Sequence, residues 1–302
     1  MSISRAFRRV PTLALCVLVL AGAGLASTPR HSESRPPFAV GLRVLKLVDT
    51  SRKVRLRNGL IEPRTLVTYV RYPARARGPF PLIVFGHGYD LTPVTYTALL
   101  RSWASAGYVV AAPVFPLENA NAPGGPNEAD LVNQPADMRF VISRLLAASS
   151  SKTGPLSRLI DPRHIAVAGH SDGGETALAA AYDRPFRDPR VRAAIILSGA
   201  ELAGRFTFPR RSPPLLATQG TADAINQPSN TTAFFDAAPR PKFLLTLEGA
   251  GHLPPYTDEQ PQLRIVERVT TAFLDHYFEQ GSLQRLIAAG TVPGTARLTA
   301  DP

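Results

Sequence analysis

The sequence predicts an α/β fold in which one mostly parallel central sheet is covered by helices on both faces. Short apolar runs recur between residues 81 and 247, and longer helix-like segments separate them. Strands that are buried on both faces read as continuous apolar runs, and parallel strands need long crossover connections, which are usually helices. No internal repeat divides the chain, and its 302 residues, 44% hydrophobic and 19% charged, suit one large core.

The predicted elements follow from these runs in chain order. Two strands come first, at residues 40–47 and 65–72, and further strands are expected at residues 81–85, 108–113, 165–168, 193–197, 214–217 and 242–247. Helices are expected near residues 93–106, 134–149, 172–183 and 261–279. Ligands bind at the carboxyl ends of the strands in such a sheet. The strand-to-helix loops are therefore where the chemistry is expected.

The N-terminal residues predict a secretory signal peptide over residues 1–26. Three arginines, the last of them Arg9, precede a short apolar run, and Ala23 and Ala26 offer small residues for cleavage. An uncleaved membrane anchor is the alternative, but no 20-residue segment is purely apolar, so we expect a secreted protein without stable membrane insertion. The rest of the chain is interpreted as a flexible leader over residues 27–38, a catalytic domain over residues 39–290 and a disordered tail over residues 291–302.

The net charge of +11 is concentrated near the N-terminus. Residues 27–80 carry twelve Lys and Arg against three Asp and Glu, whereas residues 81–302 are close to neutral. Because the basic residues are not interleaved with aromatic residues, the pattern favours a solvated edge or weak attraction to anionic surfaces over nucleic-acid binding. Cys16 is the only cysteine. Disulfides, cysteine zinc sites and a thiol nucleophile are thereby excluded from the mature chain. We expect the protein to be a monomer.

A Gly-x-Ser-x-Gly segment around Ser171 is the most informative motif. An apolar strand runs into Gly169 and Ser171, and an Ala-rich helix follows Gly173. A nucleophilic serine on a sharp strand-to-helix turn needs small residues on both sides, because the backbone there is crowded. The turn also places the serine at a helix N-terminus, where amide groups favour a developing oxyanion. The motif therefore predicts Ser171 as a nucleophile.

A serine hydroxyl needs a neighbouring base, and the sequence offers two histidines after Ser171. His252 lies in a glycine-containing loop after the 242–247 strand. Where the nucleophile lies on such a strand-to-helix turn, the acid and the histidine come later in the chain, each just after a strand. His276 lies in the middle of a predicted helix, where an ordinary packed or surface histidine is expected. We therefore assign the base to His252.

The acid of the predicted triad is Asp223. It follows an apolar strand and a glycine turn, and its expected role is to hold the His252 tautomer and to stabilise the imidazolium. Asp236 is a competitor, but it lies in a helix-like stretch where a solvated side chain is expected.

The loop after the 81–85 strand is predicted to complete an oxyanion hole. We assign the two donors to the backbone N–H groups of Tyr89 and Asp172, with Gly88 as the alternative to Tyr89. Tyr89 and His170 are predicted to contribute to substrate binding. For His87 we expect a structural hydrogen bond rather than a role as catalytic base.

Four segments in this order carry a resemblance to a known superfamily: Gly86-His-Gly-Tyr89, Gly169-His-Ser-Asp-Gly-Gly174, Gly220-Thr-Ala-Asp223 and Gly249-Ala-Gly-His252. The chain resembles the α/β-hydrolases over residues 40–285. Within them it is similar to the branch of dienelactone-hydrolase-like proteins, chlorophyllases, platelet-activating-factor acetylhydrolases and cutinase-type polyester hydrolases. The resemblance implies an α/β-hydrolase fold with Ser171, Asp223 and His252 as the triad.

The sequence departs from these relatives at several positions. Dienelactone hydrolases use a cysteine where this chain has Ser171, and polyester hydrolases usually have a methionine where it has Asp172. Polyester hydrolases also carry a tryptophan after the strand that follows the elbow, whereas Trp103 belongs to an earlier segment. Residues 201–213 are too few to build a cap domain, which predicts an open, shallow site.

The sequence therefore predicts a secreted serine hydrolase that cleaves carboxylic esters with short to medium acyl chains, with polyesters as a further substrate class, and without a metal or organic cofactor. The alternatives are a lipid or platelet-activating-factor-type acetylhydrolase, and a peptidase or acyltransferase that uses the same triad. A non-enzymatic binding relative would predict a broken triad, whereas all three members are present. The loop at residues 117–127 is either a wall of the site or a plain surface loop.

Overall fold

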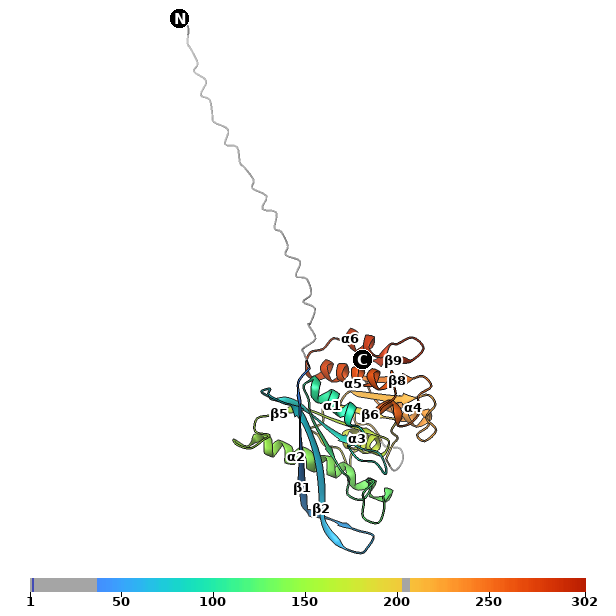
Figure 1. Ribbon diagram of the computed structural model, residues 1–302. Coiled ribbons are helices and arrows are strands. Elements are labelled where there is room, and N and C mark those ends of the chain that lie inside the picture. The colour runs from blue at the N-terminus through green and yellow to red at the C-terminus, as the bar shows by residue number, and fades with distance from the viewer. Residues whose placement is uncertain (1, 3–36, 203–206) are drawn as a thin grey trace. The chain divides into compact units, whose positions relative to one another are not determined.

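The computed structural model describes residue 2 and residues 37–202 and 207–302. Within them the chain forms one nine-stranded sheet of order β1-β2-β4-β3-β5-β6-β7-β8-β9, with helices on both faces (Figure 1). The predicted signal peptide and residues 27–36 of the predicted leader lie outside the described residues. The α/β architecture predicted from the sequence is confirmed.

The elements have the following bounds. The strands are β1 (Val40–Arg55), β2 (Ile61–Pro73), β3 (Phe80–Gly86), β4 (Val109–Pro113), β5 (Ile160–His170), β6 (Ala193–Leu197), β7 (Leu215–Gly220), β8 (Lys242–Leu247) and β9 (Ala296–Asp301). The helices are α1 (Thr97–Ala106), α2 (Gln134–Ser150), α3 (Asp172–Tyr182), α4 (Pro228–Ala237), α5 (Gln262–Phe278) and α6 (Leu283–Gly290), with the 3-10 helices η1 (Glu128–Asn133) and η2 (Pro254–Tyr256).

The strands from β3 to β8 pair in parallel, and the antiparallel pairs lie at the two edges of the sheet. On one side β1 pairs with β2 and β2 with β4; on the other, β8 pairs with β9. The central strands β3, β4 and β6 are buried at every position. This burial agrees with their continuous apolar sequences, because helices cover both faces of a parallel sheet.

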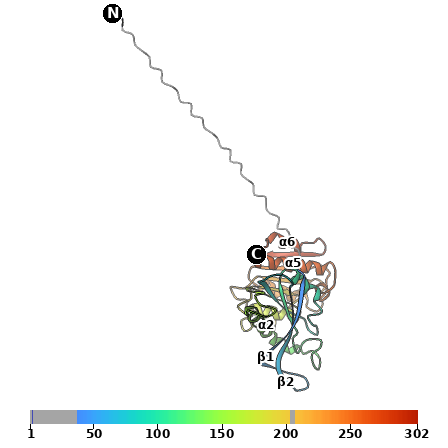
Figure 2. The ribbon, with the colours of Figure 1, turned by 60° about the vertical axis from the view of Figure 1, so that its left-hand side comes forward.

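Two hydrophobic cores lie on opposite faces of the sheet. One is formed with α1, α5 and α6 around Trp103 and Phe273, and the other with α2, α3 and α4 around Met138 and Phe234. Figure 2 shows α2 on one side of the strands and α5 with α6 on the other. Burial of each large apolar side chain contributes roughly 1.5–3 kcal/mol to folding. The two cores therefore hold the sheet, and the loops at its ends, in a fixed position.

The predicted disordered tail at residues 291–302 is wrong. Residues 296–301 form β9, which continues the sheet beside β8, with Leu245 opposite Leu298. Ala296 and Leu298 are buried, because alternate side chains of this edge strand face the α5–α6 core. The domain predicted over residues 39–290 therefore extends to the end of the described chain.

The leader prediction also fails at its last residue. The N–H of Phe38 donates a hydrogen bond to the Ser105 carbonyl, and its ring packs edge-on against Phe80. The connection from β6 to β7, at residues 198–214, contains no helix or strand in its described part. This agrees with the prediction that there is no cap domain.

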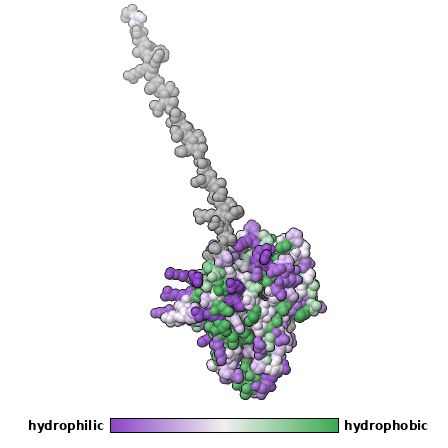
Figure 3. Space-filling model, in the orientation of Figure 1, coloured by the Kyte–Doolittle hydropathy of each residue, from purple (hydrophilic) through white to green (hydrophobic). Residues whose placement is uncertain are grey.

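The exposed side chains of the β1–β2 hairpin are a mixture of apolar and basic residues. Leu42 and Val44 on β1 and Ile61 on β2 are more than half exposed, and basic residues alternate with them. Figure 3 shows apolar side chains among hydrophilic ones on the part of the surface where this hairpin lies. No helix in the described residues is long and apolar enough to cross a membrane.

Candidate active site

The predicted site residues come together at the edge of the sheet that is formed by the carboxyl ends of its parallel strands. Tyr89 follows β3, Ser171 follows β5, Asp223 follows β7 and His252 follows β8. These four strands run in parallel, so their carboxyl ends lie at the same edge. The sheet topology thus brings together four segments that are far apart in the sequence.

The turn at Ser171 has the backbone geometry of a nucleophile elbow. Its φ is +54° and its ψ is −124°, a conformation that a residue with a side chain rarely adopts. The Ser171 N–H donates to the Leu197 carbonyl of the neighbouring strand β6, and its carbonyl accepts from Gly174 N–H at 2.7 Å. These hydrogen bonds hold the strained turn between β5 and α3.

The two glycines of the motif allow the elbow to pack closely. A Cβ on Gly169 would lie 1.9 Å from the Gly173 carbonyl oxygen, and one on Gly173 would lie 2.2 Å from the Gly86 carbonyl oxygen. No side chain fits at those distances. Both glycines of Gly-x-Ser-x-Gly are therefore required by the approach of β3, β5 and α3 to one another.

Asp223 and His252 form a hydrogen-bonded pair. His252 Nδ1 lies 2.8 Å from Asp223 Oδ2, and the Asp223 side chain is fully buried. The other carboxylate oxygen, Oδ1, accepts the backbone N–H groups of Ile225 and Asn226, each at 3.0 Å. Because the carboxylate can only accept, His252 Nδ1 carries the proton and Nε2 is left to accept one.

The competing acid and base of the sequence lie elsewhere. Asp236 is exposed on α4, as the sequence predicted, and within the described residues no hydrogen bond or ion pair joins it to a histidine. His276, near the end of α5, hydrogen-bonds through Nδ1 to the Gly281 carbonyl at 2.7 Å. Neither residue is at the edge where Ser171 lies.

His170 connects the elbow to the loop that carries His252. Its Nε2 donates to the His252 carbonyl at 2.9 Å, so its Nδ1 accepts the Tyr96 hydroxyl at 2.8 Å. Among the described residues no hydrogen bond joins Ser171 to the His252 ring. Hydrogen bonds of this kind are often long in unliganded sites and tighten when substrate binds.

The burial of His170 is at odds with its predicted role in substrate binding, which stays a prediction. Its ring is 1% exposed, and both nitrogens are engaged with protein groups. Burial, followed by the neighbouring His252, lowers the pKa of His170 to about 3, so the ring stays neutral. His170 therefore supports the site from inside the protein.

The loop after β3 lies against the nucleophile. A Cβ on Gly88 would lie 3.2 Å from Ser171 Cβ, and the Gly88 N–H donates to the Tyr96 hydroxyl at 3.2 Å. The N–H groups of Tyr89 and Asp172 have no acceptor among the described residues. With the Gly88 amide engaged, the predicted donor pair Tyr89 and Asp172 is favoured over the alternative at Gly88.

His87 has the structural role expected from the sequence. It is fully buried, its Nδ1 donates to the Gly88 carbonyl at 2.9 Å, and its Nε2 accepts the Phe115 N–H at 3.0 Å. Burial lowers the pKa of His87 to about 4. A neutral imidazole thus ties the loop after β3 to the segment after β4.

Comparison with known proteins places the chain in a family. The family model Chlorophyllase matches residues 47–229, which is more than half of the chain and includes the elbow and Asp223. This chain belongs to the Chlorophyllase family. The family consists of serine esterases of the α/β-hydrolase type. Chlorophyllase-1 from Arabidopsis thaliana is 30% identical over 141 residues, which cover 46% of this chain and 40% of that protein. The match thus spans less than half the length of this curated relative.

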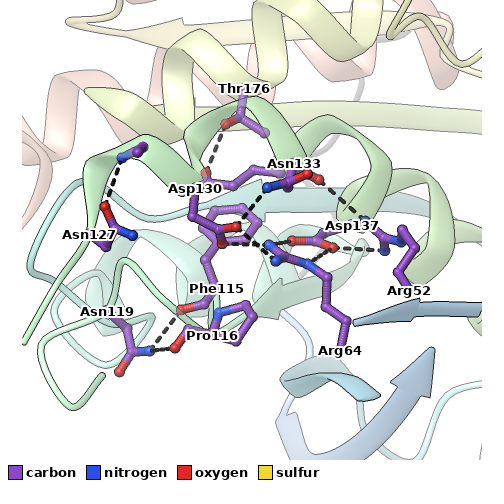
Figure 4. A network of polar contacts seen from close by, with 12 residues as sticks. Arg52, Arg64, Phe115, Pro116, Asn119, Asn127, Asp130, Asn133, Asp137 and Thr176 are labelled. Carbon is purple, nitrogen blue, oxygen red and sulfur yellow. Dashed lines mark hydrogen bonds and ion pairs between the residues drawn. The ribbon is translucent and has the colours of Figure 1, made fainter. Parts of the chain in front are cut away.

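The sequence left open whether the loop at residues 117–127, after β4, is a wall of the site or a plain surface loop of this Chlorophyllase-family chain. Asn119 Nδ2 donates to the Phe115 carbonyl at 2.7 Å, and Asn127 caps the start of η1 through Ala129 N–H (Figure 4). The Asp90 N–H donates to the Glu118 carbonyl at 3.0 Å. The loop at residues 117–127 is therefore fastened to the predicted oxyanion loop rather than lying free on the surface.

A buried ion-pair network holds η1 and α2, the two helices that follow this loop in the chain. Arg64 of β2 contacts Asp130 of η1 and Asp137 of α2, and Arg52 reaches Asp137 at 2.8 Å (Figure 4). Burial opposes the charge of Arg64, but the carboxylates of Asp137 and Asp130 outweigh it and raise its pKa. The hairpin is thereby joined to η1 and α2 through paired charges.

Two acidic residues beside the elbow were missed by the sequence analysis. Glu118 is fully buried, and burial, followed by a hydrogen bond to Asp172, raises its pKa to about 11. Glu175 lies in the first turn of α3, and burial, followed by the charge of Asp172, raises its pKa to about 8. A lone glutamate in a Pro- and Asn-rich loop gives no sequence signal of burial.

No cluster of three or more potential metal ligands occurs among the described residues.

Proposed function

We propose that this protein is a serine hydrolase of carboxylic esters that uses Ser171, His252 and Asp223. The observation that carries the proposal is the strained elbow at Ser171, at the same sheet edge as the Asp223–His252 pair. Membership of the Chlorophyllase family supports the same chemistry.

In the proposed reaction Ser171 Oγ attacks the ester carbonyl carbon while its proton passes to His252 Nε2. The C–O bond to the alcohol then breaks, and His252 gives that proton to the departing alcohol oxygen. Water attacks the acyl-enzyme in the same way, with His252 first taking and then returning a proton, and the carboxylic acid leaves. Asp223 holds the tautomer of His252 in both halves of the reaction.

The negative charge of each tetrahedral intermediate falls on the former carbonyl oxygen. We assign its stabilisation to the backbone N–H groups of Tyr89 and Asp172, which have no other acceptor in the described residues. Asp172 is the first residue of α3, so the positive end of the helix dipole adds to this effect. The Tyr89 ring, 42% exposed on the same loop, is proposed to contact the acyl group.

The substrates are proposed to be esters with short to medium acyl chains, with polyesters as a further class. The absence of secondary structure in the described part of the β6–β7 connection supports an uncapped site. The family's name makes chlorophyll a second substrate to test, since its hydrolysis is also cleavage of a carboxylic ester. We further propose export through the predicted signal at residues 1–26, to be tested by N-terminal sequencing of protein recovered outside the cell.

Turnover of p-nitrophenyl esters from acetyl to palmitoyl, beside chlorophyll and a polyester film, tests the function. We expect activity on the shorter esters and a loss of at least about 10⁴-fold in kcat for Ser171→Ala. A serine-directed fluorophosphonate should label wild type at Ser171 and leave the variant unlabelled. Folded wild-type protein without turnover of any ester, or equal activity in Ser171→Ala, would contradict the proposal.

A second variant tests the acid. Asp223→Asn should lower kcat by about 10³- to 10⁴-fold, because the amide no longer holds His252 in the productive tautomer. Asp236→Asn is the matched control, since Asp236 is the exposed competitor on the neighbouring helix; it should retain wild-type kcat. Loss of activity in the control with an active Asp223→Asn would move the acid to Asp236.

A further inference from the structure

Glu118, in the loop at residues 117–127, lies beside both segments that supply N–H donors to the proposed oxyanion hole. Its backbone carbonyl accepts the Asp90 N–H, one residue after Tyr89, at 3.0 Å. Its buried side-chain oxygens lie beside the carboxylate of Asp172, whose N–H is the other proposed donor. One residue thus contacts the two loops that must stay in register for both amides to face one oxygen.

The contacts of this carboxyl pair require a proton between them. Both side-chain oxygens of Glu118, and Asp172 Oδ2, lack an N–H or hydroxyl donor among the described residues. Two ionised carboxylates can only accept hydrogen bonds and would repel each other. A protonated Glu118 carboxyl that donates its O–H to Asp172 Oδ2 pairs one oxygen of each residue without a cation.

The groups that face this pair all oppose a second negative charge. From η1, Asp130 and Glu128 raise the pKa of Glu118 by their charges, and from α3 Glu175 faces Asp172. His87 and Tyr96 are also close enough to sense the charge of Asp172, and both are neutral because of their burial. Among the described residues, none of the main groups that shift the pKa of Glu118 is a lysine or an arginine.

We propose that Glu118 is a positioning residue whose shared proton with Asp172 holds the Tyr89 and Asp172 amides in register for the oxyanion. This rests on the proposed ester hydrolysis, because it assigns those amides a role in that reaction. Loss of the proton places two carboxylates in contact and separates the loops. The protein therefore contains an acid whose ionisation disables the site at alkaline pH.

Two substitutions of Glu118 separate positioning from simple packing. Glu118→Ala removes the hydrogen bond and should lower kcat by about 10- to 100-fold with KM little changed, because displaced oxyanion donors act on the transition state. Glu118→Gln keeps an N–H that can donate to Asp172, and should recover most of the lost kcat at neutral pH. Equal kcat in wild type and Glu118→Ala would overturn the proposal, as would equal losses in both variants.

The pH profile supplies the readout that a structural role would not change. With a simple alkyl ester and a pH-stat, wild-type kcat should fall as Glu118 ionises, at about pH 11, and this fall should be absent in Glu118→Gln. Glu175→Gln is the control for the other raised carboxyl, whose pKa is about 8. It should remove any inflection near pH 8 and retain the higher one. A wild-type profile that Glu118→Gln does not change would contradict the shared proton.

An infrared measurement tests the proton without reference to activity. In protein labelled with ¹³C-glutamate, the carbonyl band of a protonated carboxyl should persist at about pH 9.5, above the pKa of Glu175 and below that of Glu118. The band should be absent in Glu118→Gln. A missing band in the wild type overturns the inference even where a variant does not fold. Ester turnover with a missing band leaves the proposed function standing, whereas a band without turnover removes the proposed function and the positioning role that rests on it, but not the shared proton.

Discussion

The carboxylates of Asp130 and Asp137 are as deeply buried as that of Glu118, but only the first two have arginine beside them. Arg64 hydrogen-bonds both aspartates, and Arg52 adds a second contact to Asp137. Within the described part of the chain, no N–H or hydroxyl donor reaches the side chain of Glu118, which lies beside the carboxylate of Asp172. Glu118 and the two aspartates are close in the sequence, since η1 and then α2 follow the loop that carries Glu118.

The difference shows two ways of tolerating a buried acid. Next to arginine an opposite charge offsets the burial of the acid, and the pair joins strands to helices. Without a cation the acid keeps its proton, and its neutral form depends on pH. An ion pair of the first kind suits a structural joint, whereas a protonated acid of the second kind suits the edge of a reactive site.

The largest expected effect comes from removing the arginine. Arg64→Met leaves two buried carboxylates without their main partner, and should lower the free energy of unfolding by about 3–5 kcal/mol. Urea denaturation at pH 7 measures the change. Arg163→Met is the matched control, because Arg163 also pairs with an aspartate but lies on the surface. It should leave stability close to wild type. Similar midpoints for the two variants would contradict the assigned importance of burial.

An intermediate effect distinguishes the uncompensated acid. The pKa of Glu118 is raised to about 11 in the folded protein, against an ordinary value of 4.5 for a glutamate, so folding takes up a proton between these limits. The associated stability is complete below pH 4.5 and is lost as pH rises toward 11, by up to about 1.4 kcal/mol per pH unit. Glu118→Gln has no such proton, and its stability should decline less over the same range.

Denaturation of both proteins at pH 6, 7.5 and 9 makes this comparison. The measured quantity is the difference in unfolding free energy between Glu118→Gln and wild type, which should grow in favour of the variant as pH rises. A difference that is constant with pH would show that Glu118 is already ionised in the folded protein. Burial raises the pKa of Asp137 as well, but Arg64 opposes this, so substitution of Asp137 to Asn should give a smaller growth with pH than Glu118→Gln.

The sequence predicted the features that depend on local pattern. The apolar runs predicted the central strands, and the glycines around Ser171 predicted a turn whose φ is +54°. The order of strands and loops predicted that Asp223 would meet His252, and they are 2.8 Å apart. The catalytic roles of these residues remain predictions.

The features that were missed depend on contacts between distant segments. The ring of His170 faces inward because Tyr96, far earlier in the chain, supplies a hydroxyl to it. Residues 296–301 read as a tail because a short edge strand with charged residues has no pattern of its own until β8 provides its partner. The burial of Glu118 arises only when the loop after β4 folds over α3.

The smallest expected effect tests how far the uncompensated acid senses its surroundings. Glu128, at the start of η1, contributes a negative charge that raises the pKa of Glu118 without touching it. Glu128→Gln should therefore shift the alkaline fall in kcat to lower pH by about 0.2–0.5 units, a size expected for one solvated charge. In 1 M NaCl the shift should disappear, because salt screens an exposed charge. A shift toward higher pH, or one that persists in salt, would mean that Glu128 acts through a contact rather than through its charge.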